Sequence, residues 1–136
     1  MKVIVCLDDR DGMLFCGKRQ SRDRKVCERI MQLAEGSRLW MNDYSTKLFA
    51  DYPENILVDT SFLDRALDED FCFVEDCDIT PYVSAINQIV IFRWNRHYPG
   101  DKCFPVDITV LPWKLVKTCD FQGYSHEKIT MEVYRR

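Results

Sequence analysis

Short apolar runs rich in β-branched and aromatic residues alternate with segments of helical periodicity along most of the chain. A continuous apolar run of this length is typical of a strand that is buried on both faces of a parallel sheet. The clearest run covers residues 87–94, where polar and basic residues follow and the pair Pro99-Gly100 then turns the chain. We expect seven strands, at residues 2–7, 38–41, 56–58, 71–74, 87–94, 113–118 and 129–134.

The segments between these runs predict helices. The apolar positions of residues 26–34 recur at helical spacing, so we expect a helix with Ser21 as its N-cap, Asp23 in its first turn and an end near Glu35. The preceding segment, residues 13–21, is expected to be an irregular basic loop. Further helix starts are expected at Asn42 or Asp43, at Thr60 or Ser61, and at Thr80 followed by Pro81, while Pro53 is expected to interrupt the chain.

The repeated order of strand and helix predicts an α/β fold with a mostly parallel, twisted sheet that carries helices on both faces. No helix is expected between the strands at residues 113–118 and 129–134, so this C-terminal pair should join the sheet in antiparallel orientation. The chain has 136 residues, of which 46% are hydrophobic, and it shows no internal repeat or linker. We therefore expect a single domain, residues 1–136, with one core.

Composition excludes several classes of protein. The net charge of -3 argues against general binding of polyanions, so contact with RNA would need a local basic patch. The seven cysteines form no Cys-x-x-Cys pair and lie partly in apolar runs, which favours free thiols in a cytoplasmic protein. With two histidines, no metal site is expected. The first residues do not resemble a signal peptide, and no apolar run has membrane-spanning length.

The last third of the chain carries motifs of a known family. The segment Gly100-Asp101-Lys102-Cys103-Phe104-Pro105 and the later Trp113 resemble the Gly-Asp-Thr-x-Phe-Pro segment and the following Trp of dihydrofolate reductase. Asn55-Ile56-Leu57-Val58 resembles that family's Asn-Ile-Val-Leu strand, and residues 2–12 resemble its first strand and the start of the mobile loop. The order of the expected elements also matches. The resemblance therefore implies a dihydrofolate reductase-like fold.

The departures from this family fall where its chemistry lies. Glu75-Asp76 stands in place of a Gly-Gly pair at which the family's backbone approaches the cofactor pyrophosphate, and two carboxylates would repel that group. Asn42-Asp43-Tyr44-Ser45 stands in place of the family's phosphate-binding Gly-Arg-x-Thr. The Trp-x-Leu-Pro loop before the pterin-binding acid is absent, and Asp23 is the nearest candidate acid. We therefore predict no NADPH cofactor and no dihydrofolate reduction.

In an open parallel sheet, ligands bind where the carboxyl ends of the strands meet. The strongest candidate there is the basic segment 18–23, because it leads into a helix N-terminus that favours anions. Its arginines could hold a phosphate or a carboxylate in bidentate fashion. The alternative is a solvated loop whose arginines pair with Asp8, Asp9 or Asp76. The predicted ligand site comprises Lys18, Arg19, Gln20, Ser21, Arg22, Asp23, Asn42, Asn95 and Arg96.

Three further features carry weaker signals. The segment 93–96, Arg-Trp-Asn-Arg, could stack on a base or a pterin ring, or Trp94 could pack at the strand end. His126 could take part in acid-base chemistry, although a turn with capping side chains is the simpler interpretation of residues 125–128. Cys16 lies among cations that favour thiolate reactivity, and is otherwise an inert thiol. No catalytic residue is predicted.

The sequence leaves three functions open. The first is a cytoplasmic domain that binds a small anionic or nucleotide-like ligand and lacks NADPH-dependent reductase activity. The second is a protein-interaction or structural module that forms a homo-oligomer. The third is RNA binding through the basic segment. Short bacterial chains similar to this one are sometimes labelled ribonuclease Z, but the His-x-His-x-Asp-His metal motif of that family is absent.

Overall fold

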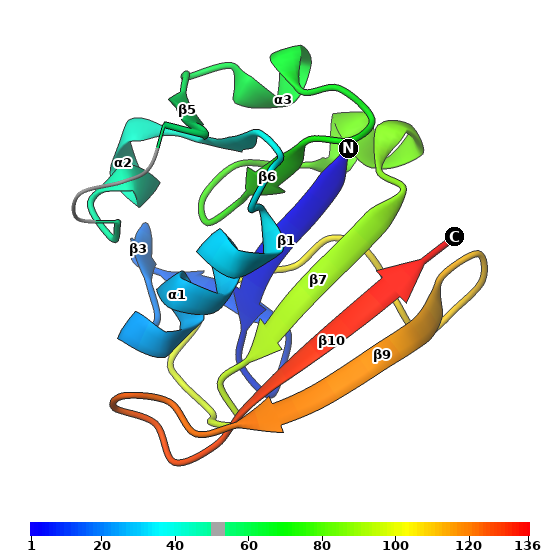
Figure 1. The fold of residues 1–136 in the computed structure, drawn as a ribbon. Coiled ribbons are helices and arrows are strands. Elements are labelled where there is room, and N and C mark those ends of the chain that lie inside the picture. Colours follow the sequence, from blue (N-terminus) through cyan, green and yellow to red (C-terminus); the bar gives the residue numbers. More distant parts are fainter. Residues whose placement is uncertain (50–53) are drawn as a thin grey trace.

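The computed structural model describes residues 1–49 and 54–136 and contains a seven-stranded sheet with β1 at its centre (Figure 1). The strand order is β5-β4-β6-β1-β7-β10-β9. These strands are β1 (Lys2–Leu7), β4 (Leu39–Met41), β5 (Ile56–Val58), β6 (Phe71–Phe73), β7 (Gln88–Arg93), β9 (Lys114–Phe121) and β10 (Ile129–Arg135). The seven strands expected from the apolar runs are therefore confirmed, with small differences at their ends.

The orientation of the strands also follows the prediction. β1 is parallel to both of its neighbours, β6 and β7, and β4 is parallel to β5 and β6. β10 is antiparallel to β7 and to β9. The sheet is thus mostly parallel with an antiparallel C-terminal addition, as the missing helix before β10 indicated.

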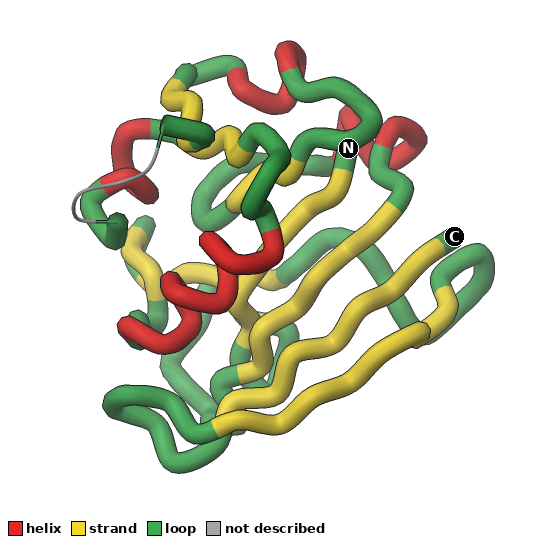
Figure 2. Tube along the Cα trace, viewed as in Figure 1, coloured by secondary structure: helices red, strands yellow, loops and turns green. Residues whose placement is uncertain are grey.

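Helices cover both faces of the sheet. They are α1 (Arg24–Leu33), α2 (Asp43–Thr46), α3 (Phe62–Arg65) and the 3-10 helix η1 (Thr80–Ala85). Figure 2 shows α1 crossing one face, where its buried Val26 and Ile30 pack with the central-strand residue Ile4. Phe62 of α3 is buried on the other face with Val5, the next residue along β1. Alternate residues of β1 therefore serve two separate apolar layers.

The segment expected to be an irregular basic loop is instead a hairpin. It contains β2 (Gly12–Phe15) and β3 (Lys18–Arg19), and β8 (Lys102–Cys103) joins β2 to complete a second, three-stranded sheet. The prediction was wrong because the two turn residues both adopt positive φ, 52° at Cys16 and 74° at Gly17. A two-residue turn of this kind matches the twist of paired strands. The hairpin carries Arg19 back over the main sheet.

Two predicted helix starts need correction. Asp23, not Ser21, is the N-cap of α1, because the Asp23 carboxylate accepts a hydrogen bond from the Lys25 amide at 2.8 Å. The segment after Thr80 is a 3-10 helix and not an α-helix. Asn42 caps α2 as expected, through a 3.1 Å hydrogen bond from the Ser45 amide. The expectation for Pro53 lies outside the described residues.

Neither cross-links nor membrane-length helices occur in residues 1–49 and 54–136. All seven cysteines are free, as predicted. None of the helices in these ranges combines the length and the apolar character needed to cross a bilayer.

Candidate functional site

An ion pair fills the carboxyl end of the central strands. Glu75 follows β6, and β3 brings Arg19 beside it. The Arg19 guanidinium donates to both carboxylate oxygens of Glu75, from Nε at 2.7 Å and from Nη2 at 2.9 Å. Ser45 Oγ donates a third hydrogen bond at 2.8 Å, and the hydrogen bonds that Arg19 donates to Glu75 raise the pKa of Arg19. About 10 Å³ of space remains here, which is room for one water molecule at most.

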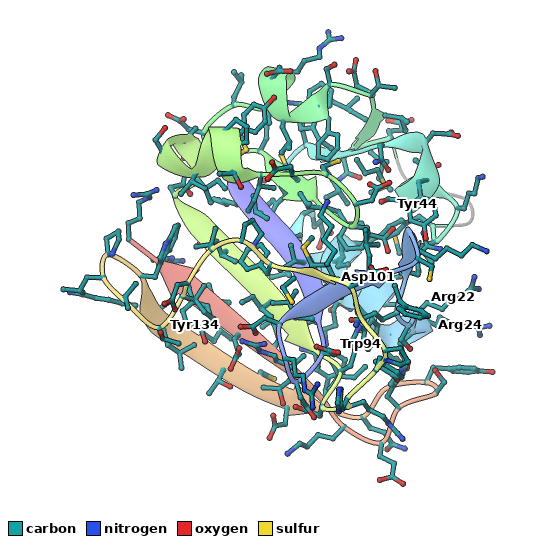
Figure 3. The ribbon with its side chains drawn as sticks, turned by 180° about the vertical axis from the view of Figure 1, so that it is seen from behind. Arg22, Arg24, Tyr44, Trp94, Asp101 and Tyr134 are labelled. Carbon is teal, nitrogen blue, oxygen red and sulfur yellow. The ribbon has the colours of Figure 1, made fainter. Side chains whose placement is uncertain are left out.

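α2 holds Arg19 from the other side. The Arg19 guanidinium lies over the ring of Tyr44, 4.1 Å from its centroid, and the Arg19 amide donates to the Tyr44 hydroxyl at 2.9 Å. Figure 3 labels Tyr44 among the side chains that surround this end of the sheet. Asn42, at the start of α2, donates from Nδ2 to Asp76 Oδ1 at 2.7 Å. Two predicted ligand residues, Arg19 and Asn42, are therefore engaged by the protein itself.

Asp8 organises the loops that follow β1. Its carboxylate is buried and accepts hydrogen bonds from the Arg10 and Gly12 amides at 2.9 and 2.8 Å. Gln20 Nε2 donates to Asp8 Oδ2 at 3.1 Å and also to the Pro99 carbonyl at 3.2 Å. Burial alone would raise the pKa of Asp8, but these hydrogen bonds outweigh it and lower the pKa. Asp8 and Gln20 thus connect three loops.

Asp23 binds the connection between β9 and β10. Its side chain is fully buried, and Oδ1 accepts hydrogen bonds from the Lys25 and Tyr124 amides at 2.8 and 2.9 Å. Oδ2 accepts from the Ser125 amide at 2.9 Å and lies 2.8 Å from His126 Nδ1. Burial alone would raise the pKa of Asp23, but the hydrogen bonds hold it well below its usual range. The carboxylate is therefore ionised at neutral pH.

The other nitrogen of His126 faces two hydroxyl groups. Nε2 lies 2.9 Å from Ser21 Oγ and 3.1 Å from the Tyr98 hydroxyl. The ring stacks on Trp94, with centroids 4.7 Å apart and planes at 26°. Trp94 is buried, so the alternative in which it packs at the strand end is the observed one. His126 lies in the connection where a capping turn was expected, but its ring is buried in a polar network.

A cleft of about 400 Å³ opens beside α1. Arg22 and Arg24 line it from the start of α1, and Lys47 lines it from the end of α2. Figure 3 shows Arg22 and Arg24 pointing outward on the same side of the molecule. Met31 and Leu48 contribute apolar surface to the same cleft. This arrangement places three cations around a partly apolar hollow.

Arg96 and Asn95 belong to a different cleft, of about 530 Å³, which they line with Glu127 and Lys128. Asn95 adopts positive φ, 56°, and its Nδ2 donates to Thr130 Oγ1 at 2.9 Å. The side chain of Asn95 therefore fixes the turn after β7.

The predicted ligand residues are divided among separate places. Arg19, Gln20 and Asn42 hold the central loops, Ser21 and Asp23 contact His126, Arg22 lines the cleft beside α1, Asn95 and Arg96 line the other cleft, and Lys18 is exposed on β3. That these residues bind a ligand stays a prediction.

Sequence reasoning missed the partners that the fold supplies from far along the chain. His126 is 103 residues from Asp23, and Tyr98 is 77 residues from Ser21, so no local spacing signals either contact. Lys47 could have been found as a basic residue within the short helix predicted after Asn42. Its proximity to Arg22 depends on how α1 and α2 pack.

The architecture matches a solved enzyme. A dihydrofolate reductase from Enterococcus faecalis, complexed with NADP(H) and RAB-propyl, superposes with a TM-score of 0.66 over 99% of this chain and 95% of that chain. This chain has a dihydrofolate reductase-like fold. The sequence identity is 14%, so the likeness establishes the fold alone. No protein-family model matches the chain, and no curated protein matches it.

The side chains that meet in the candidate site of this dihydrofolate reductase-like fold carry charged groups, hydroxyls and one imidazole. No cluster of three or more His, Cys, Asp or Glu side chains suited to a metal ion occurs in residues 1–49 and 54–136. Burial raises the pKa of Cys27, beside the α1 cleft, to about 11, so this thiol is neutral at physiological pH.

Proposed function

We propose that this protein binds a small anionic ligand in the cleft between α1 and α2 and has no NADPH-dependent reductase activity. The observation that supports the binding site is the convergence of Arg22, Arg24 and Lys47 on one cleft of about 400 Å³. Guanidinium groups hold phosphate and carboxylate groups bidentately, and an ammonium group adds a point charge. A partly apolar lining suits a ligand with a ring or a short chain.

The charges in this cleft favour an anion. Its acidic residues are Asp23 and Glu28. The Asp23 carboxylate is bound by His126 and two amides of the β9–β10 connection and by the Lys25 amide of α1. Glu28 pairs with Lys25 at 3.4 Å. Both negative charges are therefore balanced locally, which, among residues 1–49 and 54–136, leaves the attraction of Arg22 and Lys47 for a ligand largely unopposed.

The proposal that NADPH is not used rests on Glu75 and its surroundings. Glu75 and Arg19 occupy the space at the carboxyl ends of β1 and β6, where ligands of parallel sheets bind. A pyrophosphate would have to displace Arg19 and then lie beside the Glu75 carboxylate, which repels it.

Calorimetric titration with pyrophosphate, ADP and NADPH tests both parts of the proposal. We expect pyrophosphate or ADP to bind, Arg22→Glu and Lys47→Glu each to weaken that binding about tenfold or more, and Lys117→Glu, on the exposed strand β9, to leave it unchanged. Equal affinity in all three variants would contradict the site. Tight NADPH binding, or NADPH oxidation with dihydrofolate, would contradict the loss of reductase chemistry.

Self-association is a second candidate, because the outer strand β9 is exposed. Leu111 is 78% exposed just before this strand, and Leu115 and Val116 within it are half exposed. An open edge with apolar side chains is a surface on which a second copy of the chain can add. Sedimentation of the wild type and of Val116→Lys tests this candidate. A dimer that the substitution dissociates supports it, and a monomeric wild type contradicts it.

A further inference from the structure

Ser21, His126 and Asp23 form a continuous hydrogen-bonded chain from a partly exposed hydroxyl to a buried carboxylate. Ser21 Oγ lies 2.9 Å from His126 Nε2, and His126 Nδ1 lies 2.8 Å from Asp23 Oδ2. Both distances fall within the range expected when a base activates a hydroxyl and a carboxylate orients that base. Ser21 and Asp23 come from the segment just before α1, and the fold brings His126 from the β9–β10 connection between them.

The hydrogen bonds fix which nitrogen of His126 carries a proton. Asp23 is ionised and can only accept, so His126 Nδ1 must donate to it. In the neutral imidazole, Nε2 is then an acceptor. The groups within its reach are the hydroxyls of Ser21 and Tyr98, and either can donate. Nε2 is therefore the unprotonated nitrogen of the ring, and it can take a proton from Ser21.

The surrounding structure holds the imidazole in place. Trp94 stacks on its ring, and the Ser125 hydroxyl lies 3.2 Å from Nδ1. The Gly123 amide donates to the His126 carbonyl at 2.9 Å. A side chain at Gly123 would place its Cβ 2.6 Å from Asp23 Oδ2, so the connection can approach this carboxylate only because residue 123 is glycine. The geometry is supported from several directions, as an oriented base requires.

We propose that the protein is a serine-dependent acyl hydrolase, in which Ser21 is the nucleophile, His126 is the general base and Asp23 is a positioning residue. Ser21 Oγ forms a bond to the carbonyl carbon of a small ester while its proton passes to His126 Nε2. The bond to the alkoxide leaving group then breaks, and His126 returns the proton to that oxygen as the alcohol leaves. Water repeats the sequence, with His126 as its base, to release the acid and regenerate Ser21.

Ser21 is favoured over Tyr98 as the nucleophile. Its oxygen is the nearer of the two to His126 Nε2, and its short side chain can rotate toward an incoming carbonyl. The Tyr98 hydroxyl lies 3.4 Å from Ser21 Oγ, where it can donate to the serine oxygen or to the leaving group. The proposed activity rests on this network and not on the cleft lined by Arg22 and Lys47.

An alkyl fluorophosphonate tests the nucleophile directly, because a serine oxygen that attacks phosphorus expels fluoride and retains the phosphonyl group. Intact-mass and peptide spectra should show one adduct, on Ser21, in the wild type. Ser21→Ala should abolish the adduct. Ser84→Ala is the matched control, since it removes an exposed hydroxyl of η1 that lies outside this network, and it should still be labelled at a rate within about threefold of the wild type. A wild-type protein without an adduct, or an adduct on Tyr98, overturns the proposal.

Hydrolysis of p-nitrophenyl acetate tests turnover and the role of His126. We expect Ser21→Ala to lower the rate above the buffer background at least tenfold. His126→Gly should lose the activity, and added imidazole should restore part of it, which a merely structural histidine would not allow. Far-UV circular dichroism identifies variants that do not fold. If His126→Gly is one of these, labelling of the folded Ser21→Ala and Ser84→Ala proteins decides the question. Hydrolysis by Ser21→Ala at the wild-type rate contradicts the mechanism.

Discussion

The carboxyl end of the central strands and the cleft beside α1 are neighbouring polar regions that differ in how their charges are paired. In the first, Arg19 is bound by Glu75 and Tyr44, and about 10 Å³ of space remains. In the second, Arg22 and Lys47 line a cleft of about 400 Å³ and have no ion-pair partner among residues 1–49 and 54–136. A charged group that is paired inside the protein stabilises the fold, whereas a charged group that faces an open cleft is available to a ligand.

The comparison separates what the fold provides from what this sequence does with it. A parallel sheet offers a binding place at the carboxyl ends of its strands. Here the side chains at that place bind one another. The same types of residue, arginines and carboxylates, therefore have structural effects at one site and are proposed to have binding effects at the other.

The largest expected effect is at Asp23, whose buried carboxylate is bound by the protein itself. Asp23→Ala would remove the buried carboxylate that holds α1 to the β9–β10 connection and would leave His126 without its partner. We expect the free energy of unfolding to fall by about 3–5 kcal/mol. Urea unfolding measures it, with Asp120→Ala, an exposed aspartate of β9, as the control. A loss no larger than that of the control would show that Asp23 is not structural.

Lowering the pH should reduce the free energy of unfolding of the wild type through the same carboxylate, that of Asp23. The pKa of Asp23 is held below that of an aspartate in the unfolded chain, which is about 3.9. Its contribution is therefore fully present above that pH and is lost as the pH falls further, toward the folded-state pKa. Urea unfolding from pH 6 to pH 2 should show this loss, and it should be smaller in Asp23→Asn. Parallel pH profiles for the two proteins would contradict the assignment.

A smaller loss is expected when the ion pair at the strand ends is broken. Glu75→Gln would leave the partly buried guanidinium of Arg19 without a charged partner, at a cost of about 2 kcal/mol in unfolding free energy. Glu69→Gln is the matched control, because Glu69 is 87% exposed in its pair with Lys2. That change should cost less than about 0.5 kcal/mol. Equal effects of the two substitutions would remove the distinction between filled and open regions.

The smallest effect on stability is expected in the cleft. Arg22→Ala should change the unfolding free energy by less than about 0.5 kcal/mol, since Arg22 is exposed. The same variant should bind the proposed anion more weakly, so stability and affinity should respond independently. A loss of more than about 1 kcal/mol would mean that Arg22 belongs to the structural network.

Strands such as β4, β6 and β7 could be predicted from the sequence because their apolar runs are buried on both faces. The hairpin could not, because Phe15 and Lys18 pair across a turn whose residues, Cys16 and Gly17, were hidden in a basic segment. For Arg19, the sequence suggested a carboxylate partner at Asp8, Asp9 or Asp76. The observed partner is Glu75, one residue from the last of these.

The polar network around His126 was beyond prediction for a different reason. Its contacts with Asp23 and Ser21 span more than a hundred residues, and they form only when α1 and the β9–β10 connection meet. The sequence did place Ser21 and Asp23 among the candidate residues, on the argument that they precede a helix. It gave no reason to join them to a histidine.

Residue 123 offers a way to separate the position of a charge from its presence. A methyl group there would press on Asp23 Oδ2 and on the Ile129 side chain while leaving every ionisable group of the network intact. Gly123→Ala would therefore tilt the carboxylate without neutralising it. Whatever Asp23 does through its alignment would be altered, and whatever it does through its charge would remain.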